Sequence, residues 1–278
     1  MDVSRLAISQ ITTRNWGFAE DVSQYAALGI RAIGVWRDKV EAIGGVSMAN
    51  KILQDHQMTV TNLCFAGLFT EMTSKEQRLA IENAKLAIEQ AKFLNAGCLL
   101  MVSGPVKRHT LLGAEQLVVK SFEEIVDYAE QLGVNLGLEA LHPMDITQWS
   151  VIRTISQALD IIEKINSPRL GLFLDLYNCW WDPQLEQAIS RSAGKIMGVH
   201  IADWRENTRS FTDRTVPGEG IISLEALIAK IESVGYRGHY DIEIFSDELW
   251  SVPDNYPTVL GKVISWFIGV GEIHDAGG

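Results

Sequence analysis

The chain of 278 residues has few cysteines and little positive charge. Its three cysteines, Cys64, Cys98 and Cys179, are odd in number, lie far apart and form no CxxC pair, so neither a disulfide framework nor a structural zinc site follows. Lys and Arg number 24 against 35 Asp and Glu, which leaves a formal charge of −11 and no basic face for phosphates. We therefore expect no nucleic-acid partner.

Long apolar runs are also missing. No run approaches the roughly 18 apolar residues of a membrane-spanning helix, and the start, MDVSRLAISQIT, lacks the basic and apolar regions of a signal peptide. A soluble, cytoplasmic protein without a membrane partner is expected. The GxGxxG turn of dinucleotide-binding sheets is absent after the first apolar run, which disfavours an open doubly wound sheet.

Strand-like and helix-like patterns alternate from end to end of the chain. Strands are expected at residues 5–9, 30–36, 58–65, 97–103, 134–139, 169–175, 195–200 and 239–243. Helices are expected at about 19–28, 47–56, 74–95, 114–132, 151–165, 184–193, 223–234 and 257–271. With 47% hydrophobic residues the chain can bury a full core. This alternation predicts one α/β domain over residues 1–278, a (β/α)8 barrel.

Four consecutive predicted strands end on a side chain that can bind a metal. These side chains are Glu139, Asp175, His200 and Glu243. The C-terminal strand ends of a barrel surround one mouth, so the four should converge there. One acid at a strand end is usually a helix N-cap or a surface charge, but four metal-binding side chains in a row indicate a site for one divalent ion. Oxygen-rich ligation with one nitrogen favours Mn²⁺, with Mg²⁺ or Co²⁺ as alternatives.

The motifs around these residues read LGLEALHP, GLFLDLYN, GVHIADW with a later PGEG, and YDIEIF. They resemble those of the xylose isomerase-like TIM barrels, also called the sugar phosphate isomerase/epimerase superfamily, and the resemblance covers the whole chain. It implies that Glu139, Asp175, His200 and Glu243 bind one catalytic divalent ion. It further implies that the two glutamates exchange protons with a substrate carbon, as in ketose epimerases, where a metal on the substrate oxygens stabilises the enediolate.

Two departures from the family pattern narrow the function. Many epimerases and the related apurinic/apyrimidinic endonucleases have His three residues after the strand 6 Asp, whereas this chain has Asn178, which we expect to contact substrate. The endonucleases also carry an Asp-Arg-His triplet where Asp213 and Arg214 are followed by Thr215. A three-zinc nuclease site would thus lack two histidines, and a single-metal enzyme is favoured.

Two further residues are assigned to the site. His142, three residues after Glu139, either orients that carboxylate or acts as a general acid or base, and similar EALHP segments occur in isomerases, dehydratases and lyases. The resemblance places a substrate-binding arginine in the long loop at 202–220, where Arg205 is the nearest match. Taken singly, Asp203, Arg205, Asp213 and Arg214 in that loop are by default solvated surface charges.

Seven of the eight tryptophans fall at predicted strand ends or in the loops that follow them. Such rings can cover the C–H faces of a sugar, and we expect Trp181 and Trp204 to bind substrate. The alternative is an aromatic interface at the barrel mouth, which would make the protein a homo-oligomer.

The sequence thus predicts a metal-dependent isomerase or epimerase that acts on a small sugar or cyclic polyol by proton transfer next to a carbonyl. Its closest rival is a metal-dependent lyase or dehydratase on a keto-sugar, keto-cyclitol or 3-keto-glycoside. An endonuclease-type hydrolase and a non-catalytic carbohydrate-binding protein are disfavoured alternatives.

Overall fold

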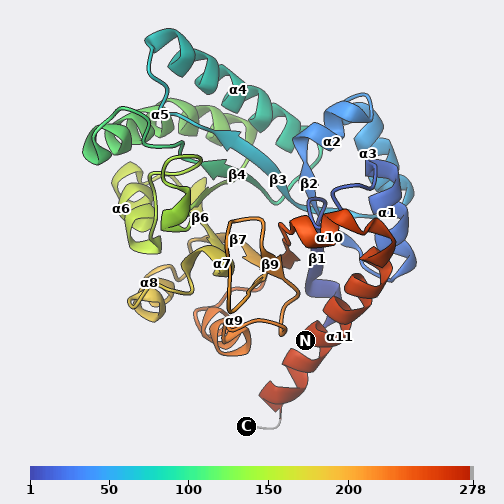
Figure 1. The fold of residues 1–278 in the computed structure, drawn as a ribbon. Helices are drawn as coiled ribbons and strands as arrows, with labels where there is room; N and C mark the ends of the chain where they lie inside the picture. Colours follow the sequence, from blue (N-terminus) through green and yellow to red (C-terminus); the bar gives the residue numbers. More distant parts are fainter. Residues whose placement is uncertain (276–278) are drawn as a thin grey trace.

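Within residues 1–275, which the computed structural model describes, eight parallel strands close into a barrel surrounded by helices (Figure 1). The strands are β1 (Leu6–Ser9), β2 (Ala32–Trp36), β3 (Thr59–Gly67), β4 (Cys98–Val102), β5 (Leu136–Glu139), β6 (Leu170–Asp175), β7 (Ile196–Ile201) and β10 (Tyr240–Ile242). Each strand pairs with its neighbours in chain order, and β10 closes the ring against β1. The predicted (β/α)8 barrel is confirmed, with every strand end within two residues of its expected position.

Helices lie outside the barrel, between successive strands. The long ones are α1 (Phe18–Ala27), α3 (Val46–Asp55), α4 (Ser74–Phe93), α5 (Leu111–Leu132), α6 (Ile155–Ile165), α8 (Leu185–Arg191), α9 (Leu224–Ser233) and α11 (Tyr256–Asp275). Three short helices follow strand ends and were not predicted: α2 (Arg37–Ala42), α7 (Leu176–Cys179) and α10 (Asp247–Ser251). No helix in the described part of the chain is long and apolar enough to span a membrane.

Side chains along each strand point alternately outward, toward the helices, and inward, toward the barrel axis, because a strand has a two-residue period. In β6, Leu170, Leu172 and Leu174 belong to the main hydrophobic core, which includes the buried faces of the helices. Phe173 instead belongs to a small second cluster inside the barrel, with Cys64 and residues of β4. Side chains at every second position from Phe173 along β6 therefore point toward the barrel axis.

Phe173 fills the middle of the barrel, and two glycines leave room for its ring. A Cβ at Gly198 would lie 2.4 Å from Phe173 Cε2, and a Cβ at Gly137 would lie 3.0 Å from Cδ2. The ring of Phe173 packs against the imidazole of His200, with 4.4 Å between ring centroids. The apolar plug thus lies next to the polar side chains of the barrel interior.

Replacing Gly198 by alanine should therefore destabilise the barrel. The added methyl overpacks the Phe173 ring, and we expect a loss of about 1–3 kcal/mol in the free energy of unfolding by chemical denaturation. Gly261 in α11 is the matched control, because a Cβ there meets nothing within 4 Å. Gly261→Ala should instead be neutral or stabilise by up to about 1 kcal/mol through helix propensity. Equal stabilities of the two variants would contradict the packing argument.

Candidate metal centre

The four predicted ligands occupy inward positions at one end of the barrel. Glu139 and Asp175 are the last residues of β5 and β6, His200 lies near the end of β7, and Glu243 follows β10. All four side chains are buried, with exposures between 0 and 5%. Three of them, Glu139, Asp175 and His200, each offer one ligand atom, and these three atoms lie within 4.8 Å of one another.

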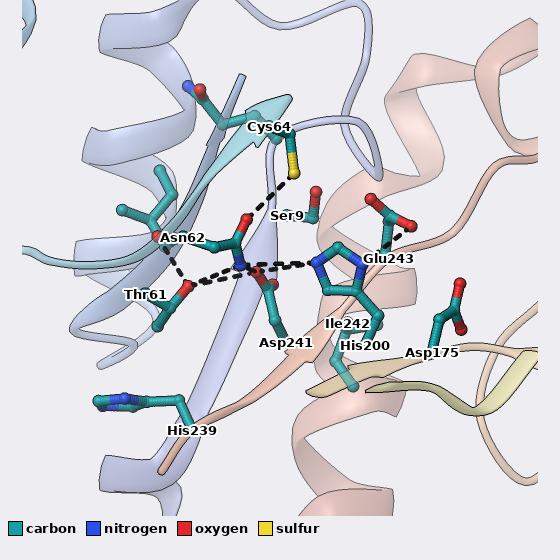
Figure 2. Close-up of polar contacts among 12 residues, drawn as sticks. Ser9, Thr61, Asn62, Cys64, Asp175, His200, His239, Asp241, Ile242 and Glu243 are labelled. Carbon is teal, nitrogen blue, oxygen red and sulfur yellow. Dashed lines mark hydrogen bonds and ion pairs between the residues drawn. The ribbon is translucent and has the colours of Figure 1, made fainter. Parts of the chain in front are cut away.

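His200 lies between two groups of polar side chains, as Figure 2 shows. Its Nδ1 is 3.1 Å from Glu243 Oε2, which is the distance of an ion pair, but this buried nitrogen makes no hydrogen bond. Its Nε2 is 3.5 Å from Asn62 Nδ2 and 3.7 Å from Asp241 Oδ2. A buried ring nitrogen that faces carboxylates without a hydrogen bond fits the coordination of a divalent ion.

Asn62, Asp241 and Cys64 support the histidine from behind. Asn62 Nδ2 donates to Asp241 Oδ2 at 2.7 Å, and the Cys64 thiol donates to Asn62 Oδ1 at 3.0 Å. The thiol thereby holds the amide with its NH₂ group toward Asp241 and His200. A carboxylate behind a metal-binding histidine is a common arrangement, because it fixes the ring and increases its basicity.

Arg214 supplies positive charge among the carboxylates. Its Nη1 donates to Asp175 Oδ2 at 2.9 Å and to Glu243 Oε2 at 3.2 Å. The guanidinium carbon lies 4.3 Å from the ring centroid of Tyr177 and 4.9 Å from that of Phe245. The default interpretation of Arg214 as a surface charge was wrong, since this side chain is buried.

A hairpin in the long seventh loop places this arginine. Strand β8 (Asp203–Trp204) pairs antiparallel with β9 (Arg214–Thr215), which turns Arg214 back over the barrel. Asp203 anchors the PGEG segment by accepting hydrogen bonds from the backbone N–H groups of Gly218 and Gly220 at 2.9 and 3.0 Å. Asp203 and Asp213 are also buried, so the expectation of surface charge was wrong for them as well. No local sequence signal indicates this pairing.

The buried charges shift one another's ionisation. Burial, together with the charges of Asp175 and Glu243, raises the pKa of Glu139 well above its usual range. Burial would also raise the pKa of Glu243, but His200 and Arg214 outweigh it, and the pKa of this carboxyl is lowered. For His200, burial favours the neutral ring, yet the Glu243 charge and its polar neighbours hold the pKa well above the ordinary value.

A cavity of about 130 Å³ opens beside the carboxylates. One part of its wall is polar and contains Glu139, Glu243, Arg214, Asn178 and Asp145. Burial raises the pKa of the Asp145 carboxyl to about 6. The rest of the wall is mostly apolar, with five aromatic rings, those of Trp36, Phe65, Trp149, Phe211 and Phe245. The cavity thus offers both hydrogen-bonding groups and ring faces to one small molecule.

Of the predicted substrate residues, only Asn178 lines this cavity, and its Nδ2 donates to Asp175 Oδ2 at 2.8 Å. Arg205 points elsewhere and pairs with Glu248 at 3.0 Å. Trp204 packs against Tyr177, with 4.8 Å between ring centroids. Trp181 donates its indole N–H to the carbonyl oxygen of Asn178 at 2.8 Å. The structure therefore does not bring Arg205, Trp181 or Trp204 to the cavity wall.

His142 also lies outside the cavity lining. Its ring is 4.9 Å from that of Trp204, and its Nδ1 accepts a hydrogen bond from the Met144 backbone N–H at 3.2 Å. Burial lowers the pKa of His142 to about 4, so the ring is neutral at neutral pH. With Nδ1 as acceptor, Nε2 carries the proton.

Residues 22–268 of the chain match the xylose isomerase-like TIM barrel family. Among curated proteins, the chain is 28% identical to inosose isomerase of Bacillus licheniformis over 191 residues, which span 66% of each chain. It is 26% identical to fructoselysine 3-epimerase of Shigella flexneri over 234 residues, 78% of this chain and 81% of the relative. A 3-dehydroshikimate dehydratase of Pseudomonas putida is 27% identical over 51% of this chain and 22% of its own length. The relatives are thus isomerases and epimerases, with a dehydratase among them.

Solved structures agree on the fold. Protein SMc04130 from Sinorhizobium meliloti 1021 superposes with a TM-score of 0.92 and 34% identity, over 97% of this chain and 99% of that one. The IOLI protein, whose structure contains a bound zinc atom, superposes with a TM-score of 0.82 and 22% identity, over 94% of this chain and 96% of that one. This second likeness shows a shared fold, and in this chain Glu139, Asp175 and His200 form a group that could hold a metal ion.

Binding of a divalent ion such as Mn²⁺ to this candidate centre should tighten as pH rises. A bound ion needs a neutral ring nitrogen on His200 and an ionised Glu139, but both groups have raised pKa values and keep their protons to higher pH than usual. Protons therefore compete with the ion until the pH exceeds those raised values. Calorimetric titration at acidic, neutral and alkaline pH, in buffers of different ionisation enthalpy, should show rising affinity and proton release. An affinity independent of pH would contradict this assignment.

Proposed function

Because the chain belongs to the xylose isomerase-like TIM barrel family, we propose that it is a divalent-metal-dependent isomerase or epimerase of a sugar or cyclic polyol. The observation that carries this proposal is the buried set of Glu139, Asp175, His200 and Glu243 beside a cavity, with an unpartnered histidine nitrogen. The isomerase and epimerase relatives support the reaction class.

In the proposed centre, the three carboxylates and His200 would hold one ion, for which Mn²⁺ is the first candidate and Mg²⁺ or Co²⁺ the alternatives. When bound there, such an ion would supply Lewis acidity, which would make the C–H bond next to a substrate carbonyl more acidic. The charges support a neutral substrate. Three carboxylates are balanced by a divalent ion together with the guanidinium of Arg214, so the site has no surplus positive charge for a phosphate.

Glu139 and Glu243 carry the proposed proton transfers. Both line the cavity, and they come from β5 and from the end of β10, on either side of β6 and β7 in the ring of strands. One carboxylate would remove the proton next to the carbonyl, and the other would return a proton to the opposite face. Asn178 Nδ2 lies 3.4 Å from Glu139 Oε1 and steadies that carboxylate.

Arg214 and Asp145 are proposed to hold the substrate. Arg214 presents a buried guanidinium to the cavity and is kept in place by Tyr177 and Phe245. It can donate hydrogen bonds to the carbonyl oxygen, where negative charge develops in the enediolate. Asp145 lines the same wall and can accept a hydrogen bond from a substrate hydroxyl.

A metal-dependent lyase or dehydratase on a keto-sugar or keto-cyclitol is the second candidate. The dehydratase among the relatives supports it, and so does His142, whose neutral ring carries a proton on Nε2 close to Glu139 in the chain. After the same C–H bond breaks, the Nε2–H of this neutral ring could donate a hydrogen bond to the departing β-hydroxyl or aglycone oxygen, while solvent supplies the proton that makes the leaving group neutral.

The proton-transfer proposal predicts deuterium incorporation. Turnover in D₂O of inososes, ketoses and 3-keto-glycosides by the Mn²⁺-loaded protein should place deuterium on the carbon next to the carbonyl, as read by NMR. Glu139→Gln and Glu243→Gln should each lower kcat by about 10²- to 10⁴-fold, because each removes one acid/base group. Bound Mn²⁺ is measured in both variants so that loss of the ion is separated from loss of the proton-transfer group.

Product analysis separates the two candidates. An isomerase conserves the mass of its substrate, whereas a lyase releases water or an aglycone. His142→Ala should leave an isomerase able to turn over, but in a lyase it should preserve deuterium exchange and abolish product release. Turnover without any deuterium incorporation, in wild type and variants alike, would contradict proton transfer through the glutamates.

Substitution of Arg214 and of Arg205 tests which of these two arginines binds the substrate. Arg214→Lys should raise KM about tenfold or more, because it removes charge-assisted hydrogen bonds of roughly 1.5–3 kcal/mol from the cavity wall. Arg205→Lys is the matched control and should leave KM within about twofold, since Arg205 pairs with Glu248 away from the cavity. Thermal unfolding of both variants checks the fold. The reverse order of KM effects would restore Arg205 as the substrate-binding residue.

A further inference from the structure

We propose that Cys64 is a metal ligand in a second coordination mode of this centre, in which Cys64, His200 and Glu243 hold a thiophilic divalent cation such as Zn²⁺ or Cd²⁺. The inference rests on the metal site of the proposed function and extends it. It adds a sulfur ligand from β3, a strand that supplies none of the four ligands identified from sequence.

The geometry brings the three groups together. Cys64 is buried, points into the barrel and lines the same cavity as Glu243. One ligand atom from each of Cys64, His200 and Glu243 lies within 4.8 Å of the other two. Ligand atoms around tetrahedral zinc are about 3.3–3.8 Å apart for bonds of about 2.0–2.3 Å. Small side-chain rotations would therefore close the three groups on one ion.

His200 provides the second observation that points to a ligand at this place. The ring is fully buried, and its Nδ1 has no hydrogen-bond partner although it lies 3.1 Å from Glu243 Oε2. His200 belongs to both groups of ligand atoms, one with Cys64 and Glu243 and the other with Glu139 and Asp175. Figure 2 shows Cys64 and Glu243 next to the imidazole of His200.

The two groups differ in the cations that they select. Glu139, Asp175 and His200 offer two oxygens and one nitrogen, which suit Mn²⁺ and Mg²⁺. Cys64, His200 and Glu243 offer sulfur, nitrogen and oxygen, which suit Zn²⁺ and its soft relatives. The identity of the ion would therefore decide which carboxylates remain free to act on the substrate.

The binding step balances without a redox change. In the metal-free chain, the Cys64 thiol donates its proton in a hydrogen bond to Asn62 Oδ1 at 3.0 Å. When the cation binds, the S–H bond breaks, the electron pair stays on sulfur and forms the metal–sulfur bond, and the proton leaves to solvent. Asn62 keeps its bond to Asp241 throughout, because that bond uses its Nδ2.

The other cysteines serve as controls. Cys98 Sγ is 4.0 Å from the carbonyl oxygen of Thr61, and Cys179 Sγ is 3.9 Å from that of Leu176. Neither is part of a group of metal-binding side chains among the described residues. Cys98→Ser is thus the matched control for Cys64→Ser. Serine at position 64 keeps an O–H donor for Asn62, so the support behind His200 is preserved while the sulfur is removed.

The test is the absorption spectrum of the protein loaded with Co²⁺ under anaerobic conditions. A thiolate ligand produces an intense sulfur-to-cobalt charge-transfer band in the near ultraviolet, besides the weaker visible bands of any bound Co²⁺. We expect this band in wild type and in Cys98→Ser and its loss in Cys64→Ser, with visible bands retained. In competition experiments, the preference for Cd²⁺ over Mn²⁺ should fall about tenfold or more in Cys64→Ser.

Each other outcome overturns the proposal. Visible cobalt bands in wild type without the charge-transfer band would remove Cys64 as a ligand and leave the metal site of the proposed function intact. A charge-transfer band that persists in Cys64→Ser, or an unchanged preference for Cd²⁺, would also exclude Cys64. Failure of wild type to bind Co²⁺ at all would overturn both this inference and the metal-dependent function.

Discussion

The burial of three carboxylates at one end of the barrel is the constraint on which the rest of the site depends. Glu139, Asp175 and Glu243 lie almost out of contact with solvent, where like charges repel strongly and lose their hydration. The folded chain places one cation among them, the guanidinium of Arg214, and a second cationic group, His200, between Glu243 and Asp241. When His200 gives up its proton, as a bound ion requires, Arg214 alone does not neutralise the three ionised carboxylates. A divalent ion in the proposed site completes the balance, and this requirement connects the fold to the chemistry.

Two parts of the barrel contribute to the site in different ways. The strands supply the four proposed ligands, and the positions of these residues follow from the paired register, in which Asp175 lies opposite His200 on β7. The seventh loop supplies Arg214 through the β8–β9 hairpin. Asp203 of this hairpin accepts hydrogen bonds from the backbone of Gly218 and Gly220 and so holds the loop in place. Ligands on strands are rigid, whereas a residue on a loop can change between relatives without disturbing the barrel. Arg214 nevertheless couples the loop to the strands, because it donates hydrogen bonds to Asp175 and Glu243.

The cavity wall is compatible with both of the proposed reaction classes. Its polar groups, including Glu139, Glu243 and Arg214, are suited to a carbonyl and its neighbouring C–H bond, and its aromatic rings to the apolar face of a sugar or cyclitol. Removal of the proton is common to isomerisation and elimination. The outcome then depends on whether the substrate has a leaving group and whether a hydrogen-bond donor such as His142 can reach it.

The sequence by itself determined the barrel, its strand ends and the convergence of Glu139, Asp175, His200 and Glu243, because strand period and the closure of a barrel are local or repetitive properties. Only the tertiary structure decided which other residues meet them. Arg214 reaches the cavity through a hairpin with no local signal, while Arg205 in the same loop turns away to Glu248. Cys64, an ordinary thiol in sequence, comes close to His200 and Glu243 because β3 and β7 face each other across the barrel. Contacts between residues far apart in the chain depend on packing and register, which no single segment encodes.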